Sequence, residues 1–257
     1  MEFAYLSDSV NLKKISETDT EGLFEIEGLY SGYGLTIGNA LRRALLSSLP
    51  GAAVTQYKIK GANHEFVTVP NVVEDAVEIG LNLKKIRFRI HTNEPQTLTL
   101  KAKGDGKVTA SDIEMNSEVE LLTPDILIAT LTSKNAELEI ELRVEKGLGY
   151  VPVEARKFEK LPIGTVALDA FFSPVTRVNF SIENMRVGDR TDYNRLILGI
   201  QTDGTVTPSA ALHKTSNILK DHFDKISSIE VRAVAEVSAE DKPKKGAKKK
   251  TIKKSKK

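Results

Sequence analysis

The chain has 257 residues, of which 40% are hydrophobic and 28% charged, and a formal net charge of +2; these values are ordinary for a soluble globular protein of one or two domains. It contains no cysteine, which excludes disulfides, thiolate metal sites and cysteine nucleophiles and fits a reducing compartment. The first ten residues, MEFAYLSDSV, do not have the pattern of a secretory signal, and no stretch approaches 18 apolar residues, so we expect a cytoplasmic protein without a membrane span.

A glycine-rich stretch and an apolar helix occupy residues 30–51, YSGYGLTIGNALRRALLSSLPG. A strand is expected just before it, at residues 23–27. Three glycines between residues 32 and 38 predict a tightly turning loop, and Pro50-Gly51 ends the helix that follows. Apolar residues recur in this helix at spacings of three and four. Arg42 and Arg43 lie about 100° apart around its axis, so at least one of them leaves the apolar side. These features together are typical of an element that packs against a partner.

The middle of the chain is predicted to be rich in strands, beginning near Val54. Within it, Asn71 and Glu74 predict a reciprocal N-cap that opens a helix continuing to Leu83. Strict alternation of apolar and polar residues then follows at 86–90, 98–100 and 137–144. Such a period of two indicates half-buried antiparallel strands with a charged outer face.

The last third of the chain predicts two more strands, a long helix and a tail. Alternation at 178–182 and 196–200 indicates the strands, and Thr207-Pro208 indicates the start of the helix. Residues 235–257 have no apolar pattern, and ten lysines stand against two acids in residues 240–257, so we expect a disordered tail. The remainder of the chain then holds 27 basic and 33 acidic residues, which makes the predicted folded part acidic.

The residues that carry chemistry form no catalytic constellation. The four histidines lack metal-ligand spacing, and no cluster of aspartates could hold paired magnesium ions. The glycine run fits neither the phosphate-loop nor the dinucleotide-binding spacing. We therefore expect no catalytic residue, no metal and no cofactor bound by this chain.

Residues 30–51 closely resemble the signature of the N-terminal assembly domain of the bacterial RNA polymerase alpha subunit. Further matches follow in the same order, and the resemblance covers roughly residues 3–232. These further matches are HEF at 64–66, NLK at 82–84, GYVP at 149–152, SPV at 173–175, RTDYNRL at 190–196 and TDGT at 202–205.

The resemblance implies an α+β fold with a discontinuous dimerisation domain. Residues 1–51 plus 165–234 would form that domain, an antiparallel sheet with two long helices, and residues 52–164 would form a strand-rich inserted domain. The two helices would build the dimer core. The residues expected at this dimer interface are Ile37, Leu41, Leu45, Leu212, Leu219 and Phe223.

The resemblance also implies which residues contact the large polymerase subunits. Arg43 matches a residue that holds the beta subunit, and the fork of its guanidinium suits pairing with a carboxylate. The other residues expected at beta are Asn39, Arg42, Ser47 and His64. Those expected at beta or beta′ are Lys84, Tyr150, Arg190, Thr191 and Asp192.

The function implied is that of an assembly scaffold of DNA-directed RNA polymerase, a nucleotidyltransferase whose catalysis lies in other subunits. Two copies would dimerise and bind beta and beta′. The resemblance implies, after a flexible linker, a small helical domain that contacts promoter DNA and activators, whereas we expect the lysine-rich tail in its place here. Contact with DNA would come through the assembled enzyme or weakly through the tail. The alternative is a stand-alone dimeric nucleic-acid-binding protein that acts through its basic tail; a small-molecule enzyme ranks last.

Overall fold

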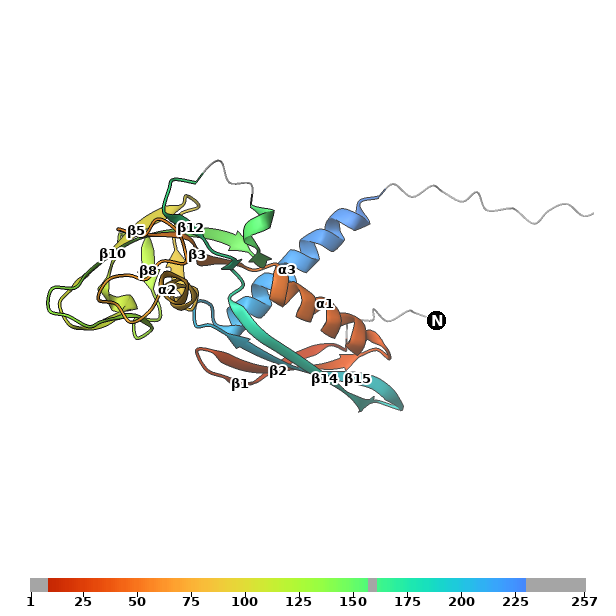
Figure 1. The fold of residues 1–257 in the computed structure, drawn as a ribbon. Helices are drawn as coiled ribbons and strands as arrows, with labels where there is room; N and C mark the ends of the chain where they lie inside the picture. The colour runs from red at the N-terminus through yellow and green to blue at the C-terminus, as the bar shows by residue number, and fades with distance from the viewer. Residues whose placement is uncertain (1–8, 157–160, 230–257) are drawn as a thin grey trace, which may run out of the picture.

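The computed structural model describes residues 9–156 and 161–229, and its first and last parts build one four-stranded unit (Figure 1). Its elements are β1 (Asn11–Glu17), β2 (Glu21–Leu29), α1 (Tyr33–Ser47), β14 (Val175–Val187), β15 (Arg190–Thr202) and α3 (Pro208–Ser227). The strands pair antiparallel in the order β1-β2-β15-β14. The helices α1 and α3 contact each other and lie on one face of this sheet.

The segment between α1 and β14 forms a second, larger unit, which we call the seven-stranded unit. Its elements are β3 (Pro50–Ile59), α2 (Ala76–Leu83), β4 (Phe88–Ile90), β5 (Gln96–Lys103), β6 (Gly106–Thr109), β7 (Ile113–Glu114), β8 (Val119–Leu121), β9 (Leu127–Leu131), β10 (Glu137–Leu148), β11 (Tyr150–Val151), β12 (Thr165–Ala167) and β13 (Ala170–Phe171). The main sheet has the order β7-β5-β10-β3-β4-β8, with β12 beside β3. The strand pairs β6–β9 and β11–β13 are separate two-stranded sheets. The α+β fold class expected from the sequence is confirmed.

Each unit has its own apolar core. In the four-stranded unit, Leu45 of α1 and Leu198 of β15 are fully buried together with residues of α3. In the seven-stranded unit, Ile79 of α2 packs with Leu100 and Ile140 of the main sheet. Each helix thus covers an apolar sheet face that would otherwise meet water.

The alternating pattern of residues 137–144 predicts the long strand β10 correctly. Its apolar residues face the core, and Ile140 has no exposed surface. Its acids face outward, where Lys103 donates to Glu137 over 2.7 Å and Lys60 donates to Glu139 over 2.6 Å. Such exposed pairs add little stability, so burial of the apolar side chains accounts for most of what holds this strand.

The glycine loop predicted before α1 is wrong, because Gly34 and Gly38 lie inside the helix. A Cβ atom at Gly38 would lie 2.8 Å from Cδ2 of Phe180, and one at Gly34 would lie 3.0 Å from Cβ of Asn194. The two glycines therefore let α1 approach β14 and β15 more closely than any side chain would allow. Asn194 also accepts hydrogen bonds at Oδ1 from the N–H groups of Gly32 (2.9 Å) and Gly34 (3.4 Å), which satisfies the start of the helix.

The start predicted for α2 is also wrong. The helix begins at Ala76, and its N-cap is Asp75, whose carboxylate accepts from the N–H of Glu78 over 2.7 Å. Glu74 instead accepts hydrogen bonds from both the N–H and the hydroxyl of Thr130 on β9. The carboxylate that the local capping pattern assigned to the start of α2 therefore binds a residue on a distant strand instead.

The start of α3 follows the prediction, with Thr207 extended at the N-cap and Pro208 at the first helical position. Thr207 makes no capping hydrogen bond with its side chain. The N–H of Ser209 instead donates to Oε1 of Glu17 on β1 over 2.8 Å. Hydrogen bonds from Ser209, and then from Lys14, lower the pKa of Glu17 from 4.5 to about 2. The tail predicted at 235–257 lies outside the described residues.

We predict that Glu17→Gln lowers stability at neutral pH. The pKa of Glu17 is lower in the folded chain than its ordinary 4.5, so the carboxylate stabilises the fold above pH 4.5, and this contribution disappears as the pH falls toward 2. Urea denaturation of wild type and variant should give curves that differ at pH 7 and converge near pH 2. Glu94→Gln is the control, because Glu94 makes no ion pair with any described residue. A difference that stays constant with pH would contradict the assignment.

We also predict that Gly38→Ala destabilises the protein although alanine favours helices. The gain in helix propensity is about 0.5–1 kcal/mol, whereas overpacking against Phe180 costs about 1–3 kcal/mol. Asn39→Ala, at the neighbouring exposed position, should leave stability unchanged or raise it slightly. Thermal unfolding of both variants measures the contrast, and equal midpoints for the two would refute close packing at Gly38.

Candidate interaction surfaces

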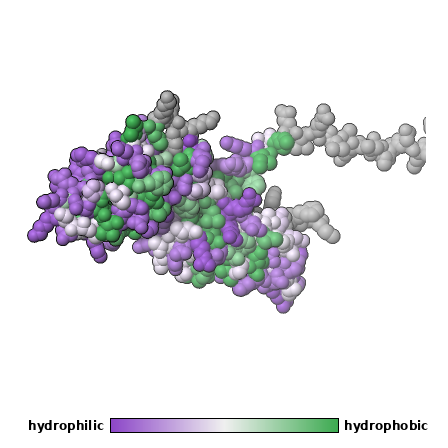
Figure 2. All heavy atoms as spheres, in the orientation of Figure 1, coloured by the Kyte–Doolittle hydropathy of each residue, from purple (hydrophilic) through white to green (hydrophobic). Residues whose placement is uncertain are grey.

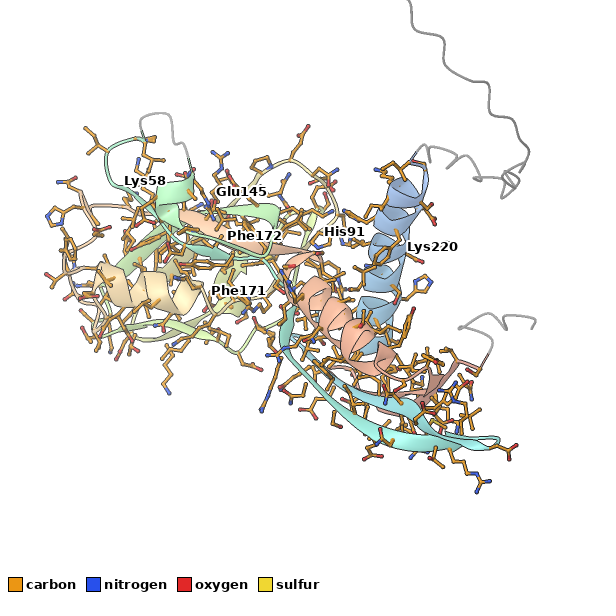
Figure 3. All side chains as sticks on the ribbon, turned by 90° about the vertical axis from the view of Figure 1, so that its right-hand side faces the viewer. Lys58, His91, Glu145, Phe171, Phe172 and Lys220 are labelled. Atoms are coloured by element: carbon orange, nitrogen blue, oxygen red, sulfur yellow. The ribbon has the colours of Figure 1, made fainter. Side chains whose placement is uncertain are left out.

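Three segments meet where the two units join: the end of α1, β11 and β13. A Cβ atom at Gly149 would lie 3.6 Å from the carbonyl oxygen of Ser47, the last residue of α1. The next residue, Tyr150, pairs with Phe171 across the β11–β13 ladder. Figure 3 shows Phe171 and Phe172 at this junction. The predicted contact residues Ser47 and Tyr150, far apart in the sequence, therefore lie on one surface.

Asp169 joins Lys84 to this surface. Nζ of Lys84 lies 3.4 Å from Oδ2 of Asp169, and the N–H of Val153 donates to Oδ1 over 3.0 Å. The Val153 hydrogen bond, with help from the Lys84 charge, holds the pKa of Asp169 below its usual value. Burial, and then the Asp169 charge, raises the pKa of Tyr150. The structure therefore assembles Lys84 and Tyr150 around a carboxylate that sequence reasoning did not single out.

We call the group Arg43, Ser47, Lys84, Tyr150 and Phe171 the junction surface. Tyr150 is 56% exposed and Phe171 39% exposed, so the two rings are open to a partner, and the half-buried Lys84 lies at Asp169 in the same group. Exposed aromatic rings next to arginine are the composition that protein interfaces favour. No local sequence signal marks Phe171, because its exposure depends on the pairing of β13 with β11.

Helix α1 presents its polar side chains along an exposed face. Asn39, Arg42, Arg43 and Ser47 are all exposed. Neither arginine forms an ion pair with another residue of the described ranges, and the carbonyl of Arg43 accepts the Ser47 hydroxyl over 2.8 Å. Both guanidinium groups are therefore available for a carboxylate on another protein.

Arg190, Thr191 and Asp192 are the first residues of β15 and lie near the other end of α1, a helix of 15 residues that is about 22 Å long. Arg190 binds Asp192 with two hydrogen bonds, of 2.7 Å and 3.0 Å, which raise the pKa of the guanidinium. Its Cζ also lies 4.8 Å from the ring centre of Tyr30 and 5.5 Å from that of Tyr193. Thr191 is exposed beside this stack. The structure therefore separates these predicted contacts from the junction surface.

His64 lies on an exposed loop before α2. Its Nδ1 accepts from the N–H of Phe66 over 3.2 Å, and Phe66 itself is 77% exposed. Among the described residues, no hydrogen bond or ion pair joins His64 to the junction surface. Of the predicted beta-contact residues, His64 is thus the one that the fold places apart.

The residues predicted for the dimer interface differ in exposure. Leu41, Leu45 and Leu212 are buried within the protomer, and Ile37 and Leu219 are partly buried against the same core. Phe223 is 62% exposed, and Ile226 and Ile229 follow it with 67% and 74% exposed. In Figure 2 the last described part of α3 is coloured as hydrophobic. Of the predicted dimer residues, the exposed one therefore lies on the second half of α3, whereas Leu41 and Leu45 of α1 belong to the protomer's own core.

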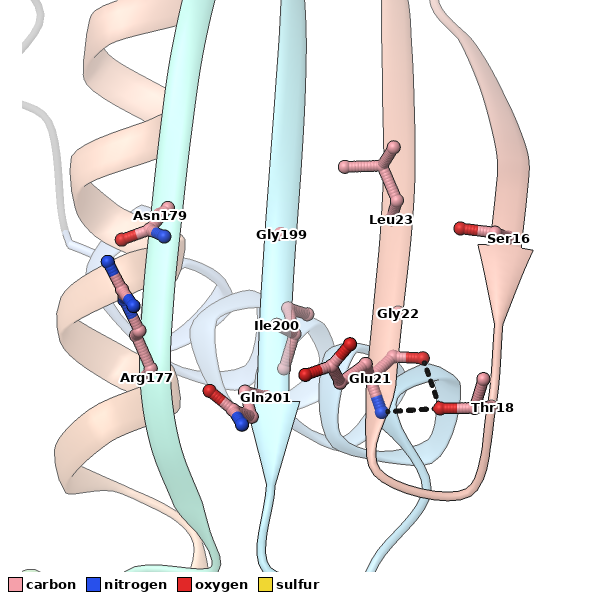
Figure 4. Close-up of a pocket in the computed structure, with 10 residues that line it drawn as sticks. All are labelled: Ser16, Thr18, Glu21, Gly22, Leu23, Arg177, Asn179, Gly199, Ile200 and Gln201. Atoms are coloured by element: carbon pink, nitrogen blue, oxygen red, sulfur yellow. Dashed lines mark hydrogen bonds between the residues drawn. The ribbon is translucent and has the colours of Figure 1, made fainter.

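A hollow of about 330 Å³ lies on the open face of the four-stranded sheet, away from α1 and α3 (Figure 4). Gly199 forms part of its floor, and Arg177 and Gln201 stand at its edge. The side chain of Thr18 forms two hydrogen bonds with the backbone of Glu21, which close the β1–β2 turn at one side of the hollow. The hollow is open, its lining is both polar and apolar, and its residues do not converge as a catalytic group would.

Metal and membrane features are absent from the described part of the chain. Within residues 9–156 and 161–229, no three histidine, aspartate or glutamate side chains gather closely enough to hold a metal ion. None of the helices in those ranges combines the length and apolar character that crossing a bilayer requires. The candidate functional sites among the described residues are therefore exposed surfaces and not a catalytic cleft.

Comparison with known proteins identifies the family. A family model described as the RNA polymerase Rpb3/RpoA insert domain matches residues 57–173. A DNA-directed RNA polymerase subunit alpha from Symbiobacterium thermophilum is 48% identical over 215 residues, covering 84% of this chain and 68% of the relative. Those from Alkaliphilus oremlandii and Moorella thermoacetica are 47% and 46% identical, covering 84% and 86% of this chain and 68% and 70% of the relative. The chain therefore belongs to the bacterial DNA-directed RNA polymerase alpha subunit family.

Proposed function

We propose that this chain is the assembly scaffold of a DNA-directed RNA polymerase. Two copies dimerise, and the dimer binds the beta and beta′ subunits to nucleate the core enzyme. The observation that carries the proposal is the junction surface, because it joins the exposed Arg43 of one unit to the half-buried Lys84 and the exposed aromatic rings of the other. Nucleotidyl transfer then belongs to the partner subunits, and this chain acts in the cytoplasm without a cofactor.

Each exposed surface has a proposed partner. Arg43, supported by Asn39, Arg42 and Ser47, binds the beta subunit, and His64 contacts beta from its separate loop. Lys84 and Tyr150 extend the same contact to beta or beta′. The start of β15, with Arg190, Thr191 and Asp192, lies at the far end of α1 and suits a second contact with a large subunit, because contacts with two tyrosine rings hold the Arg190 guanidinium in one place.

The dimerisation domain is proposed to consist of residues 1–51 plus 165–234, with residues 52–164 as the insert. The separate cores of the two units support this division. The exposed apolar residues Phe223 and Ile226 of α3 support a helical dimer contact, since a second copy would remove them from water. The buried leucines of α1 then support the dimer by holding the helices in place.

The alternative function is that of a stand-alone dimer that binds nucleic acid through its lysine-rich tail. Its support is the charge of the tail in the sequence, since lysines that neutralise phosphates release counterions. The tail lies outside the described residues. Gel filtration with purified beta and beta′, in the absence of nucleic acid, separates the two functions: a scaffold elutes as a stable complex, and a nucleic-acid-binding dimer elutes alone.

We predict that Arg43→Ala weakens capture of the beta subunit at least about tenfold while the homodimer stays intact. Truncation removes a charge that pairs across the interface and leaves the partner carboxylate without its counterion. The measurement is a titration of beta against the dimer, with light scattering to follow the dimer itself. Arg177→Ala is the matched control, because this exposed arginine forms no ion pair among the described residues and lies on the sheet face away from α1. Equal affinity of Arg43→Ala and wild type for beta would remove Arg43 from the interface.

We further predict that Phe223→Asp shifts the dimer toward monomers by at least about tenfold in the dissociation constant. The aspartate would enter the apolar contact as an unpaired charge. Phe223 is 62% exposed in the protomer, so this variant should fold, whereas a charge at the fully buried Leu45 would disrupt the protomer core. Asn217→Asp on the same helix is the control, because its position is exposed and polar. Analytical ultracentrifugation measures both variants, and a dimer of undiminished strength for Phe223→Asp would disprove the α3 contact.

A further inference from the structure

Two arginines make the polar side-chain contacts between the four-stranded and seven-stranded units. The chain itself crosses between the units twice, after α1 and before β14. Apart from these crossings, the side-chain hydrogen bonds and ion pairs that join the two units, among the residues the structure describes, come from Arg87 and Arg89 at the start of β4. Both reach the turn between β15 and α3, which contains Asp203 and Thr205.

Hydrogen bonds within the four-stranded unit hold this turn in place. Oδ1 of Asp203 accepts from the N–H of Thr205 over 3.0 Å and from its hydroxyl over 2.6 Å. The N–H of Asp203 donates to the carbonyl of Pro174 over 2.9 Å, which ties the turn to the start of β14. The turn is therefore a fixed point of the four-stranded unit and not a loose loop.

Arg87 binds the turn through Oδ2 of Asp203, the carboxylate oxygen that does not bind Thr205. Nε of Arg87 lies 3.6 Å from Oδ2 of Asp203, and the side chain of Asp203 is only 8% exposed. The same guanidinium donates from Nη1 to the carbonyl of Phe171 over 3.3 Å and lies 5.7 Å from the ring centre. Because water is largely excluded from Asp203, this ion pair is screened less than a surface pair would be. Arg87 therefore links the turn directly to the junction surface.

Arg89 makes the second link. Its Nη2 donates to the carbonyl of Thr205 over 2.8 Å, and its Nη1 donates to Oε2 of Glu120 on β8 over 2.8 Å. Glu120 thus holds the guanidinium in place on the seven-stranded unit while the other nitrogen reaches the turn. The contacts of Arg87 and Arg89 together resist rotation of one unit relative to the other about the chain crossings, whereas a single contact would permit it.

We propose that Arg87 and Arg89 are positioning residues that fix the angle between the two units and so keep the junction surface in one piece. Arg43 and Ser47 belong to the four-stranded unit, whereas Lys84, Tyr150 and Phe171 belong to the seven-stranded unit. A large polymerase subunit that binds both groups meets them at one spacing only while the angle is fixed. This inference rests on the proposed function for its consequence in assembly, but the fixed angle itself does not.

The consequence for binding depends on how often the two units adopt the angle that a large subunit can bind, which we call the competent angle. If loss of both arginines leaves the competent angle populated about one tenth of the time, the apparent affinity for the large subunits falls about tenfold, although no contact residue has changed. The effect is thus one of pre-organisation, and it should disappear for a partner that touches only one unit.

The test measures the angle directly. The chain has no native cysteine, so Glu94→Cys on the seven-stranded unit and Lys214→Cys on α3, both exposed, can carry a pair of spin labels. Doubly labelled full-length chain is mixed with an excess of unlabelled chain, so that a dimer contains one labelled protomer, and the distance distribution is recorded by pulsed electron resonance. We expect one narrow distribution for wild type and at least twice its width for Arg87→Ala/Arg89→Ala. Binding of beta and beta′ by that variant should be about tenfold weaker.

Three further variants make the result specific. Arg87→Lys/Arg89→Lys keeps both charges and should restore most of the narrow width and of the binding. Asp203→Asn keeps the oxygen that binds Thr205 but removes the charge that faces Arg87, so it should broaden the distribution even if the double alanine variant fails to fold. Arg143→Ala is the control, because Arg143 pairs with Glu145 in its own strand, and it should change nothing.

Each outcome decides the inference. A broad distribution in wild type, or an unchanged width in folded Arg87→Ala/Arg89→Ala and in Asp203→Asn, would overturn it. If the widths change as expected while wild type itself fails to bind beta and beta′, the positioning role stands and the proposed assembly function falls. If the width increases without any loss of binding, the angle does not matter for assembly, and that part of the inference is wrong.

Discussion

The close approach of α1 to the β14–β15 ribbon is the contact on which the other features depend. Gly34 and Gly38 remove the side chains that would hold the helix away from the sheet, and Asn194 satisfies the first amide groups of the helix from within β15. Leu45 is fully buried as a result, which is worth about 1.5–3 kcal/mol for a side chain of its size. The position of α1 decides where its two ends lie, and hence how the junction surface and Arg190 at the start of β15 lie relative to each other.

The four-stranded unit therefore acts as a frame that holds α1, and chain crossings and polar side-chain contacts attach the seven-stranded unit to that frame at three places among the described residues. Two of these are chain crossings, and the third is the pair of arginines that bind the Asp203 turn. An arrangement of this kind suits a scaffold, because a partner that contacts both units recognises a fixed spacing of cations and rings and not one side chain alone. Affinity then depends on pre-organisation as well as on contacts.

The regular elements could be predicted from local patterns. The alternation of residues 137–144 gave the orientation of β10, and Thr207-Pro208 located the start of α3 within one residue. Local patterns were insufficient where a distant residue competes for the same group. Glu74 fits a capping pattern for α2, but Thr130 takes its carboxylate, and Asp75 becomes the cap. The glycines of α1 suggested a loop because the ribbon that they approach is formed by residues about 150 positions later.

The candidate site was predictable in part. The resemblance to the family supplied Arg43, Lys84 and Tyr150 as separate positions, and no pattern in the sequence indicated that Asp169 would join the last two. Arg87, Arg89 and Asp203 were not found for the same reason, since an ion pair between residues more than 100 positions apart leaves no periodic signal. Only the folded arrangement of the two units shows that these charges face each other.

The most direct measurement of the central claim is the native mass of the complex that the full-length chain forms with purified beta and beta′ in the absence of nucleic acid. The account predicts one species that contains two copies of this chain with one beta and one beta′. A chain that remains a single protomer, and leaves both large subunits unbound at micromolar concentration, would contradict it.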